Sequence, residues 1–398
     1  MALLIGCSPT DQPAEHGLTS AEPTAGGATI ASAAGFAAAN AGSNAPPSML
    51  SAGGVALGSA GSAAISGSGG SSVAGFGASA GSGPAAISGS GGSGGMGAPA
   101  QPVAGAKATM CSTAPADAPA EAVAAYNATN MWRLAVGSGC MTLVPALDKS
   151  AQSHCDYNAS NMSDAMCVAD AHGEVMSCMG FTGVDVQARE KAAGYNSAMG
   201  VTEVLTTGGT PEQAVKGWID TLWHRIPMLD PWTSEMGWGN ASGCDVIDFG
   251  RGSNVSPNST VVVYPYDGQT GVPVSFDGRY ESPMPPMPDS GWPSSAMINI
   301  YALAIKVTDH LLTKDGDPTP LDHKWIDETS TEIDAGYRGY LYNTAFLYGN
   351  KPFAANTKYR VKVSGTHSGG AIDLEWTFTT GARESVRHSV IEQMARQR

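Results

Sequence analysis

The sequence predicts an α+β fold class, with a cysteine-rich α+β domain, an all-β sandwich after it and a long disordered tether before both. Three observations lead to this prediction. Six of the seven cysteines fall between residues 111 and 244, helical and extended patterns alternate through the same region, and cysteine-free strand patterns follow it. The chain has 398 residues, enough for two ordinary domains and for additional segments around them.

Residues 1–7 are the first segment with a recognisable pattern. They end in Leu4-Ile5-Gly6-Cys7, which resembles the lipobox of bacterial lipoproteins, where a small residue precedes the cysteine that receives the lipid. The apolar stretch is shorter than that of a complete signal peptide. We therefore interpret residues 1–7 as a partial lipoprotein signal and Cys7 as the lipid attachment site.

Residues 8–110 are predicted to be a disordered tether. Gly, Ala, Ser and Pro dominate this segment, Trp and Tyr do not occur in it, and no charged residue lies between Glu22 and Lys107. The whole chain has 51 Gly and is only 14% charged, which also indicates a large unstructured share. Such a segment cannot bury enough apolar surface to offset the loss of chain entropy on folding.

Charge and hydropathy exclude two classes of partner. The formal net charge is −14, whereas nucleic acids and anionic membrane surfaces attract basic patches. No run of roughly 18 apolar residues occurs, so the sequence predicts no transmembrane helix. We therefore expect no nucleic-acid partner, and we expect membrane contact only through the lipid anchor.

The cysteines indicate a disulfide framework and an oxidising, exported location. A metal cluster is the weaker interpretation, because no Cys-x-x-Cys pair occurs. Six cysteines allow many pairings. We favour Cys167–Cys178, which closes a short loop in the region with the fewest helical signals. The cysteines of the framework are Cys111, Cys140, Cys155, Cys167, Cys178 and Cys244.

Residues 111–256 are predicted to form the α+β domain. Apolar residues recur at helical spacing up to Val136, and two glycines then stop this first helix. Thr210-Pro211-Glu212 supplies an N-cap, a first-turn proline and a first-turn acid for a later helix. We expect helices at 116–136, 145–162 and 210–222, a further element starting at 189–195, a loop at 163–182, and strands at 201–207 and 236–248.

Residues 257–381 are predicted to form an all-β sandwich of immunoglobulin-like type. Strand patterns are separated by turns that contain Pro and Gly, and no helix is expected between them. The stretch from Tyr264 to Pro273 resembles the opening of bacterial immunoglobulin-like modules. Residues 382–398 are predicted to be a charged tail. We expect strands at 261–264, 302–307, 337–347, 359–363 and 374–380.

The segment from about residue 122 to residue 250 resembles the CAP superfamily of cysteine-rich secretory proteins, antigen 5 and pathogenesis-related 1, in its bacterial SCP-like form. This resemblance implies a three-layer α-β-α sandwich. The order and spacing of several short motifs carry it. These are Tyr126-Asn127 through Trp132-Arg133, Arg189 with Ala193-Gly194-Tyr195, Trp218 with Leu222-Trp223-His224-Arg225, and Glu235-Met236-Gly237-Trp238-Gly239.

The resemblance also implies a cleft with two histidines and two acids. By position, His172 and His224 are the histidines and Glu203 is the first acid; the second acid is Glu212, with Asp220 as its rival. Two imidazoles and flanking carboxylates form a divalent metal site that suits Zn²⁺, or a base and an acid for hydrolysis. The motif departs from the family where Thr202-Glu203-Val204 replaces Gly-Glu-Asn and where Trp223 precedes the histidine.

Each of these residues also has a structural interpretation. His224 could be a buried histidine at a helix end, and His172 a solvent-exposed turn residue. Glu203 could hold helix N–H groups or an arginine such as Arg225, and Glu212 could do no more than favour a helix N-terminus. The sequence leaves these alternatives open.

The resemblance implies an exported protein, either a cell-surface lipoprotein or an extracellular one, that binds a lipid or a surface protein without catalysing a reaction. Members of the family are linked to lipid or sterol binding, to protein partners and in a few cases to proteolysis. A metal-dependent hydrolase that uses His172, His224 and Glu203 is the first alternative. A structural or adhesive envelope protein is the second.

Overall fold

The structure, a computed structural model, describes residues 3–5, 110–196, 200–252 and 256–382. The lipid site predicted at Cys7, the tether apart from its last residue and the tail after residue 382 lie outside these ranges. Within the described part of the chain, no helix is both long enough and apolar enough to cross a membrane.

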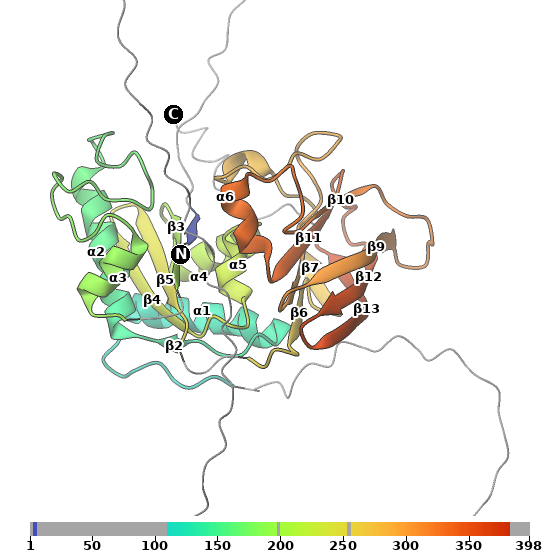
Figure 1. Ribbon diagram of the computed structural model, residues 1–398, viewed down its shortest axis with the longest axis horizontal. Coiled ribbons are helices and arrows are strands. Elements are labelled where there is room, and N and C mark those ends of the chain that lie inside the picture. The colour runs from blue at the N-terminus through green and yellow to red at the C-terminus, as the bar shows by residue number, and fades with distance from the viewer. Residues whose placement is uncertain (1–2, 6–109, 197–199, 253–255, 383–398) are drawn as a thin grey trace, which may run out of the picture. The chain divides into compact units, whose positions relative to one another are not determined.

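A mixed sheet with helices on both faces forms the first half of the fold (Figure 1). Its strand order is β1-β3-β5-β4-β2, with β3, β5 and β4 antiparallel to one another. Helices α2 and α3 cover one face, while α1, α4 and α5 cover the other. The strands are β1 (Leu3–Ile5), β2 (Thr142–Leu143), β3 (Val201–Thr206), β4 (Glu235–Ala241) and β5 (Cys244–Gly250). The helices are α1 (Ala120–Val136), α2 (Pro145–Asn161), α3 (Val186–Ala193), α4 (Pro211–Ile219) and α5 (Arg225–Leu229).

The two faces of this sheet follow from alternation along its strands. Val204 and Ile247 pack with α1, α4 and α5, whereas Leu205 and Val246 pack with α2. Glu203 and Asp248 therefore share the α2 side of the sheet with Leu205 and Val246, and they pair in register across β3 and β5.

Two glycines of β4 let α2 lie directly on the sheet. A Cβ added at Gly237 would lie 2.1 Å from backbone atoms of Leu147 and Asp148, and one added at Gly239 would lie 2.2 Å from the backbone of Ala151. The Glu-Met-Gly-Trp-Gly motif thus has a packing role, since no side chain fits between β4 and α2 at these positions.

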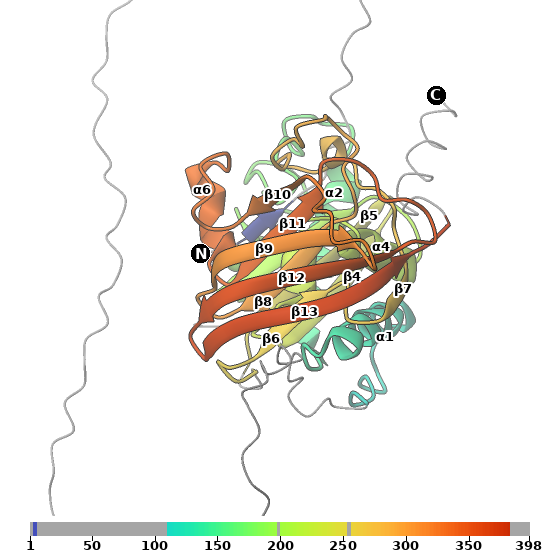
Figure 2. The ribbon, with the colours of Figure 1, turned by 90° about the vertical axis from the view of Figure 1, so that its right-hand side faces the viewer.

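The second half of the fold is a sandwich of two four-stranded sheets (Figure 2). Side chains from both sheets, such as Ile300 and Val361, meet in one apolar core. The assignment to the immunoglobulin-like type stays a prediction. One sheet has the order β10-β11-β8-β6 and the other β7-β13-β12-β9. The strands are β6 (Val261–Tyr264), β7 (Gln269–Val272), β8 (Ile298–Ala302), β9 (Lys306–Lys314), β10 (His323–Ile326), β11 (Thr344–Gly349), β12 (Lys358–His367) and β13 (Gly370–Thr380).

Two strand predictions in this half were wrong. The stretch 302–307 is not one strand, because the chain turns between β8 and β9 with Ala304 in the left-handed region at φ 52°. The stretch 337–347 begins with helical turns, α6 (Ala335–Arg338) and η2 (Gly339–Leu341), before β11. Another short turn, η1 (Gly278–Tyr280), precedes β8. Aromatic and β-branched residues led to the strand predictions at 302–307 and 337–347. These residue types recur there because the side chains are buried, not because the backbone is extended.

The two halves share hydrophobic cores across the boundary predicted near residue 257. Tyr264 and Tyr301 belong to the core of the first half. Conversely, Leu222, Trp223 and Ile226 pack into a cluster whose other members come from the second half. Trp223, next to the predicted site residue His224, is therefore buried in a shared core.

All six cysteines of the described region form disulfides. The predicted bond Cys167–Cys178 is confirmed. Such a framework forms and persists in an oxidising compartment, so the protein is an exported one. The other two bonds are Cys111–Cys140 and Cys155–Cys244.

Candidate functional site

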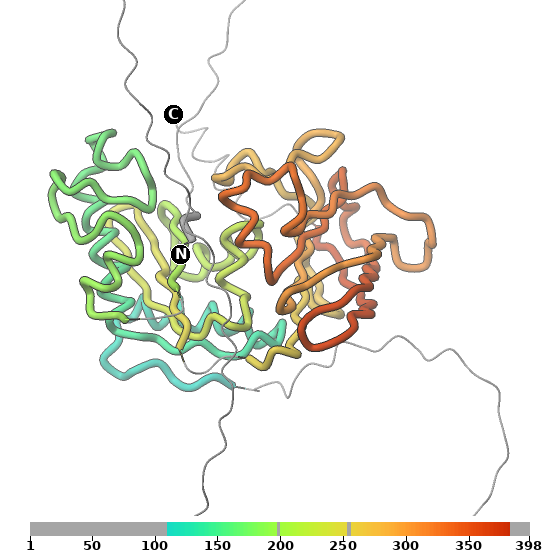
Figure 3. The backbone as a smooth tube through the Cα atoms, viewed as in Figure 1, coloured from blue at the N-terminus to red at the C-terminus, as the bar shows by residue number. Residues whose placement is uncertain are grey.

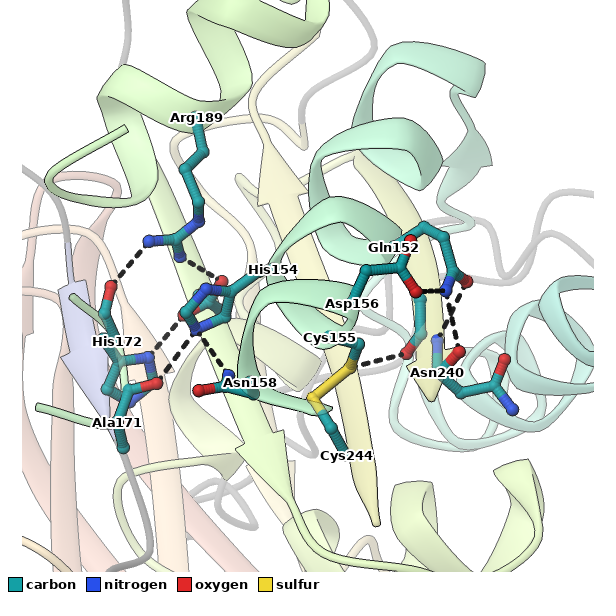
Figure 4. The surroundings of a disulfide bond; sticks show 12 residues. Gln152, His154, Cys155, Asp156, Asn158, Ala171, His172, Arg189, Asn240 and Cys244 are labelled. Atoms are coloured by element: carbon teal, nitrogen blue, oxygen red, sulfur yellow. Dashed lines mark hydrogen bonds and ion pairs between the residues drawn. A yellow bond between two sulfur atoms is a disulfide. The ribbon is translucent and has the colours of Figure 1, made fainter. Parts of the chain in front are cut away.

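A buried cluster of charged and polar side chains lies between the sheet and helices α2 and α3. Each member has at most 5% of its surface exposed. Figure 4 shows part of this cluster beside the Cys155–Cys244 disulfide, with His154, His172 and Arg189 turned toward one another. Its members are His154 on α2, His172 and Glu174 in the loop after α2, Arg189 and Glu190 on α3, Glu203 on β3 and Asp248 on β5.

Glu203 is the centre of the cluster. Its Oε1 lies 2.6 Å from Nδ1 of His172, and its Oε2 accepts a hydrogen bond of 2.5 Å from Nη2 of Arg189. Nη1 of Arg189 also donates to the carbonyl of His172 at 2.7 Å. Burial alone would raise the pKa of Glu203, but the positive charge of Arg189 and the contacts with His154 and His172 lower it well below the ordinary range.

Glu174 and His154 form a second pair in the cluster. Nδ1 of His154 lies 3.0 Å from Oε1 of Glu174, and its Nε2 lies 2.9 Å from the carbonyl oxygen of Ala171. Oε2 of Glu174 accepts hydrogen bonds from the backbone N–H groups of Thr182 and Gly183. Although burial opposes it, hydrogen bonding by His154 and by the backbone lowers the pKa of Glu174. Glu174 therefore ties the long loop to α2.

Two further carboxyls in the cluster have raised pKa values. Burial, followed by the negative charges of Asp248 and Glu203, raises the pKa of Glu190 to about 10. Burial and the charge of Glu203 also raise the pKa of Asp248 well above its ordinary value. The cluster thus contains the ionised pair Arg189–Glu203, with two carboxyls of raised pKa beside it.

His224 has a different set of partners. It lies between α4 and α5, and its Nδ1 is 3.1 Å from the hydroxyl of Thr221 and 3.2 Å from Oε1 of Glu281. Glu281 comes from the second half of the fold and also accepts the backbone N–H groups of Leu222 and Trp223. Hydrogen bonding to His224 and the backbone outweighs burial and lowers the pKa of Glu281. His224 is thus held by the β-sandwich side of the molecule.

The second acid of the predicted site does not lie in this cluster. Glu212 is exposed at the start of α4, where the helix backbone and Thr210 lower its pKa. Its rival Asp220 is buried and pairs with Lys216. Glu174 does lie in the cluster, although it was not predicted from the sequence. Its position two residues after the predicted site residue His172 was the sequence signal that could have identified it.

The structure also corrects two of the structural interpretations. His172 is not a solvent-exposed turn residue, because only 3% of its surface is exposed. Glu203 pairs with Arg189 rather than with Arg225. Arg225 instead donates to the carbonyls of Ile219 and Met297 and lies 4.1 Å from the ring centre of Tyr264.

The described residues are not grouped as the zinc site that the resemblance implied would require. Nδ1 of His172 contacts Glu203 and Nδ1 of His224 contacts Glu281, so a metal ion would have to meet the Nε2 atoms. Nε2 of His172 is buried without a hydrogen bond. Throughout the described ranges, no three His, Cys, Asp or Glu side chains are grouped to hold a metal ion.

An open pocket lies where the two halves of the fold meet. Its volume is about 210 Å³. Thr202 at the start of β3 and Arg251 after β5 line one side, and the loop before β11 supplies Tyr342 to the other. Asp230 also lines it and pairs with Arg251 at 3.2 Å. Tyr342 is 50% exposed, so an aromatic ring is available to a ligand.

Comparison with known proteins identifies the first half of the fold. Residues 126–262 match the model of CAP, the cysteine-rich secretory protein family. Among solved structures, the chain is similar to an extracellular protein containing a SCP domain from Bacillus anthracis str. Ames, with 14% sequence identity and a TM-score of 0.26. That match covers 33% of this chain and 40% of the other, so the chain spans about two fifths of its length. No curated protein matches the chain. Residues 126–262 of the chain therefore form a CAP domain.

Proposed function

We propose that this exported CAP-domain protein is displayed on the cell surface and binds a ligand without catalysing a reaction. The observation that carries the proposal is the pocket between the CAP domain and the β-sandwich, which is open while the buried cluster is closed. Binding pockets occur preferentially where two structural units meet.

The pocket's chemistry suits recognition of a protein. Tyr342 and Tyr340 contribute to its wall, and tyrosine is enriched in protein interfaces because it offers a large rigid surface with a polar tip. A volume of about 210 Å³ lies below the range of about 300–1,000 Å³ that encloses a whole drug-sized molecule. The pocket therefore suits one anchoring side chain of a protein, or the polar end of a lipid.

The buried cluster is better suited to stability than to catalysis. A general base must reach the proton that it abstracts, directly or through one water. His172 and Glu203 contact each other and have at most 3% of their surfaces exposed. None of the seven cluster residues lines the open pocket. A substrate in the pocket thus meets Asp230 and Arg251, which pair with each other, rather than an acid–base pair.

Surface display rests on Cys7 and the tether that follows it. A lipid on Cys7 together with the Gly- and Ser-rich segment would hold the CAP domain near the membrane while leaving it free to reach a partner. Metabolic labelling with an alkyne fatty acid tests this part. We expect label on the wild type and none on Cys7→Ser; equal labelling of the two would refute lipid attachment at Cys7.

Photo-crosslinking in the producing cells tests ligand binding. The photoreactive residue benzoylphenylalanine replaces Tyr342 in one variant and Tyr280, which is similarly exposed at 44%, in a control. We expect Tyr342 to give a discrete adduct that Tyr280 does not give. Mass spectrometry separates a peptide adduct from a lipid adduct. Identical adducts at both positions, or none at either, would reject the pocket as the binding site.

A further inference from the structure

Four exposed methionines surround the Cys167–Cys178 disulfide. Met162, Met166, Met176 and Met179 have 62%, 82%, 74% and 66% of their surfaces exposed. All four lie in the long loop after α2 or at its start, which Figure 3 shows in green beyond that helix. Methionine is among the residue types most often buried, so four exposed side chains in one loop need a reason.

Buried clamps hold this loop in one arrangement. The disulfide brings the Cα atoms of Cys167 and Cys178 to 6.0 Å. The hydroxyl of Tyr157 donates to the carbonyl of Cys167 at 2.8 Å and accepts from the N–H of Val175 at 2.9 Å. The side-chain amide of Asn161 donates to the carbonyl of Met179 at 2.8 Å. The end of α2 and both arms of the loop are therefore fixed together.

These clamps limit how far apart the methionines lie. Met166 and Met179 are the direct neighbours of the two bonded cysteines, so their Cα atoms are at most about 14 Å apart. Met162 follows Asn161, whose amide holds Met179. Met176 lies between Val175 and Cys178, which are both clamped. Methionine has three flexible side-chain bonds, so each thioether can take several positions around these fixed backbone points.

The loop carries negative charge, which favours a positively charged ligand. Between residues 160 and 185 the sequence has no Lys and no Arg, while Asp164 and Asp170 are exposed beside the methionines. Thioether sulfur is a soft ligand that prefers Cu(I) to Zn²⁺, Mg²⁺ or Ca²⁺. All six framework cysteines are bonded in disulfides, so they do not compete for the metal.

We propose that Met162, Met166, Met176 and Met179 form a binding site for a soft monovalent metal ion, Cu(I), on the CAP domain. The site lies outside the buried histidine–carboxylate cluster and outside the pocket at the β-sandwich. It uses a different class of ligand from the histidines and carboxylates that a zinc site requires.

Titration with Ag(I), an air-stable stand-in for Cu(I), tests the proposal. The protein is the full chain with Cys7→Ser, which removes the remaining thiol. Calorimetry in chloride-free buffer gives stoichiometry and affinity, and the signals of ¹³C-labelled methionine methyl groups show which of the 17 methionines respond. The test variant carries Met166→Leu and Met179→Leu. The control carries Met284→Leu and Met287→Leu, which replace methionines of similar exposure, 58% and 57%, elsewhere.

We expect one Ag(I) per chain and shifts in the methyl signals of the four loop methionines. The loop variant should lose affinity by more than about ten-fold, and the control should match the wild type. Leucine keeps the apolar surface and removes only the sulfur, so an apolar docking face would survive the substitution. No Ag(I) binding, binding that the loop variant retains, or shifts confined to other methionines would each overturn the proposal.

Discussion

The neutral carboxyl of Glu190 makes the pH dependence of stability predictable. Its pKa is raised from 4.5 to about 10, so the folded chain holds a proton that the unfolded chain releases above pH 4.5. The wild type therefore loses stability as pH rises through this window. Each pH unit corresponds to about 1.4 kcal/mol, which gives an upper limit of about 5 kcal/mol at about pH 8. Glutamine has the shape of a protonated glutamate and releases no proton.

Glu190→Gln should therefore match the wild type near pH 5 and be more stable at about pH 8, with a gap that widens by about 1.4 kcal/mol per pH unit. Urea unfolding with disulfides intact, followed by the fluorescence of the buried Trp218 and Trp223, measures the gap. Glu212→Gln, at an exposed glutamate, is the matched control and should show almost none of it. The reasoning is refuted if Glu190→Gln is less stable than the wild type at high pH, because Glu190 would then be ionised beside Arg189.

Three further substitutions test other parts of the structure. Glu281→Gln should lower the free energy of unfolding by about 2–3 kcal/mol at neutral pH. Because the pKa of Glu281 is lowered from 4.5, the difference in stability from the wild type should shrink only below pH 4.5, which urea unfolding at several pH values measures. Gly239→Ala should destabilise by about 1–3 kcal/mol because its Cβ would strike the backbone of α2, whereas Gly217→Ala, which meets nothing within 4 Å, should not; thermal melts compare the two. His310 has a pKa lowered by burial and by His323, so the wild type should lose stability as pH falls below 6.5. Thermal melts of His310→Phe at two pH values should show a smaller loss.

Local sequence signals predicted the elements of the CAP domain well. Helix α2 begins at the predicted Pro145 and ends one residue before the predicted end. Thr210 caps α4 as predicted, although its capping-box partner is Gln213 rather than an acid. The strands β3, β4 and β5 lie within a residue or two of their predicted ranges. These features depend on neighbours a few residues away, and periodicity and capping report such contacts.

Side-chain partners far apart in sequence could not be predicted in this way. The bond between Arg189 and Glu203 spans 14 residues, and the contact between His224 and Glu281 spans 57. Nothing in periodicity states which carboxylate a buried arginine meets. The resemblance placed Glu203 in the site, and Arg225 was only one example of an arginine that this carboxylate could hold. The fold directs Arg225 into the opposite core instead.

The β-sandwich determines which CAP surfaces remain available. Its Glu281 accepts two backbone N–H groups in front of His224 and contacts the imidazole itself, so this histidine is part of a buried junction. The same junction buries Trp223, the residue that precedes His224. A few residues away, the junction leaves the pocket lined by Tyr342 open. Addition of the sandwich thus removes one CAP histidine from solvent and creates a new concave surface. Ligand specificity should therefore depend on residues from both halves, and the CAP domain alone would present neither the closed histidine nor the complete pocket.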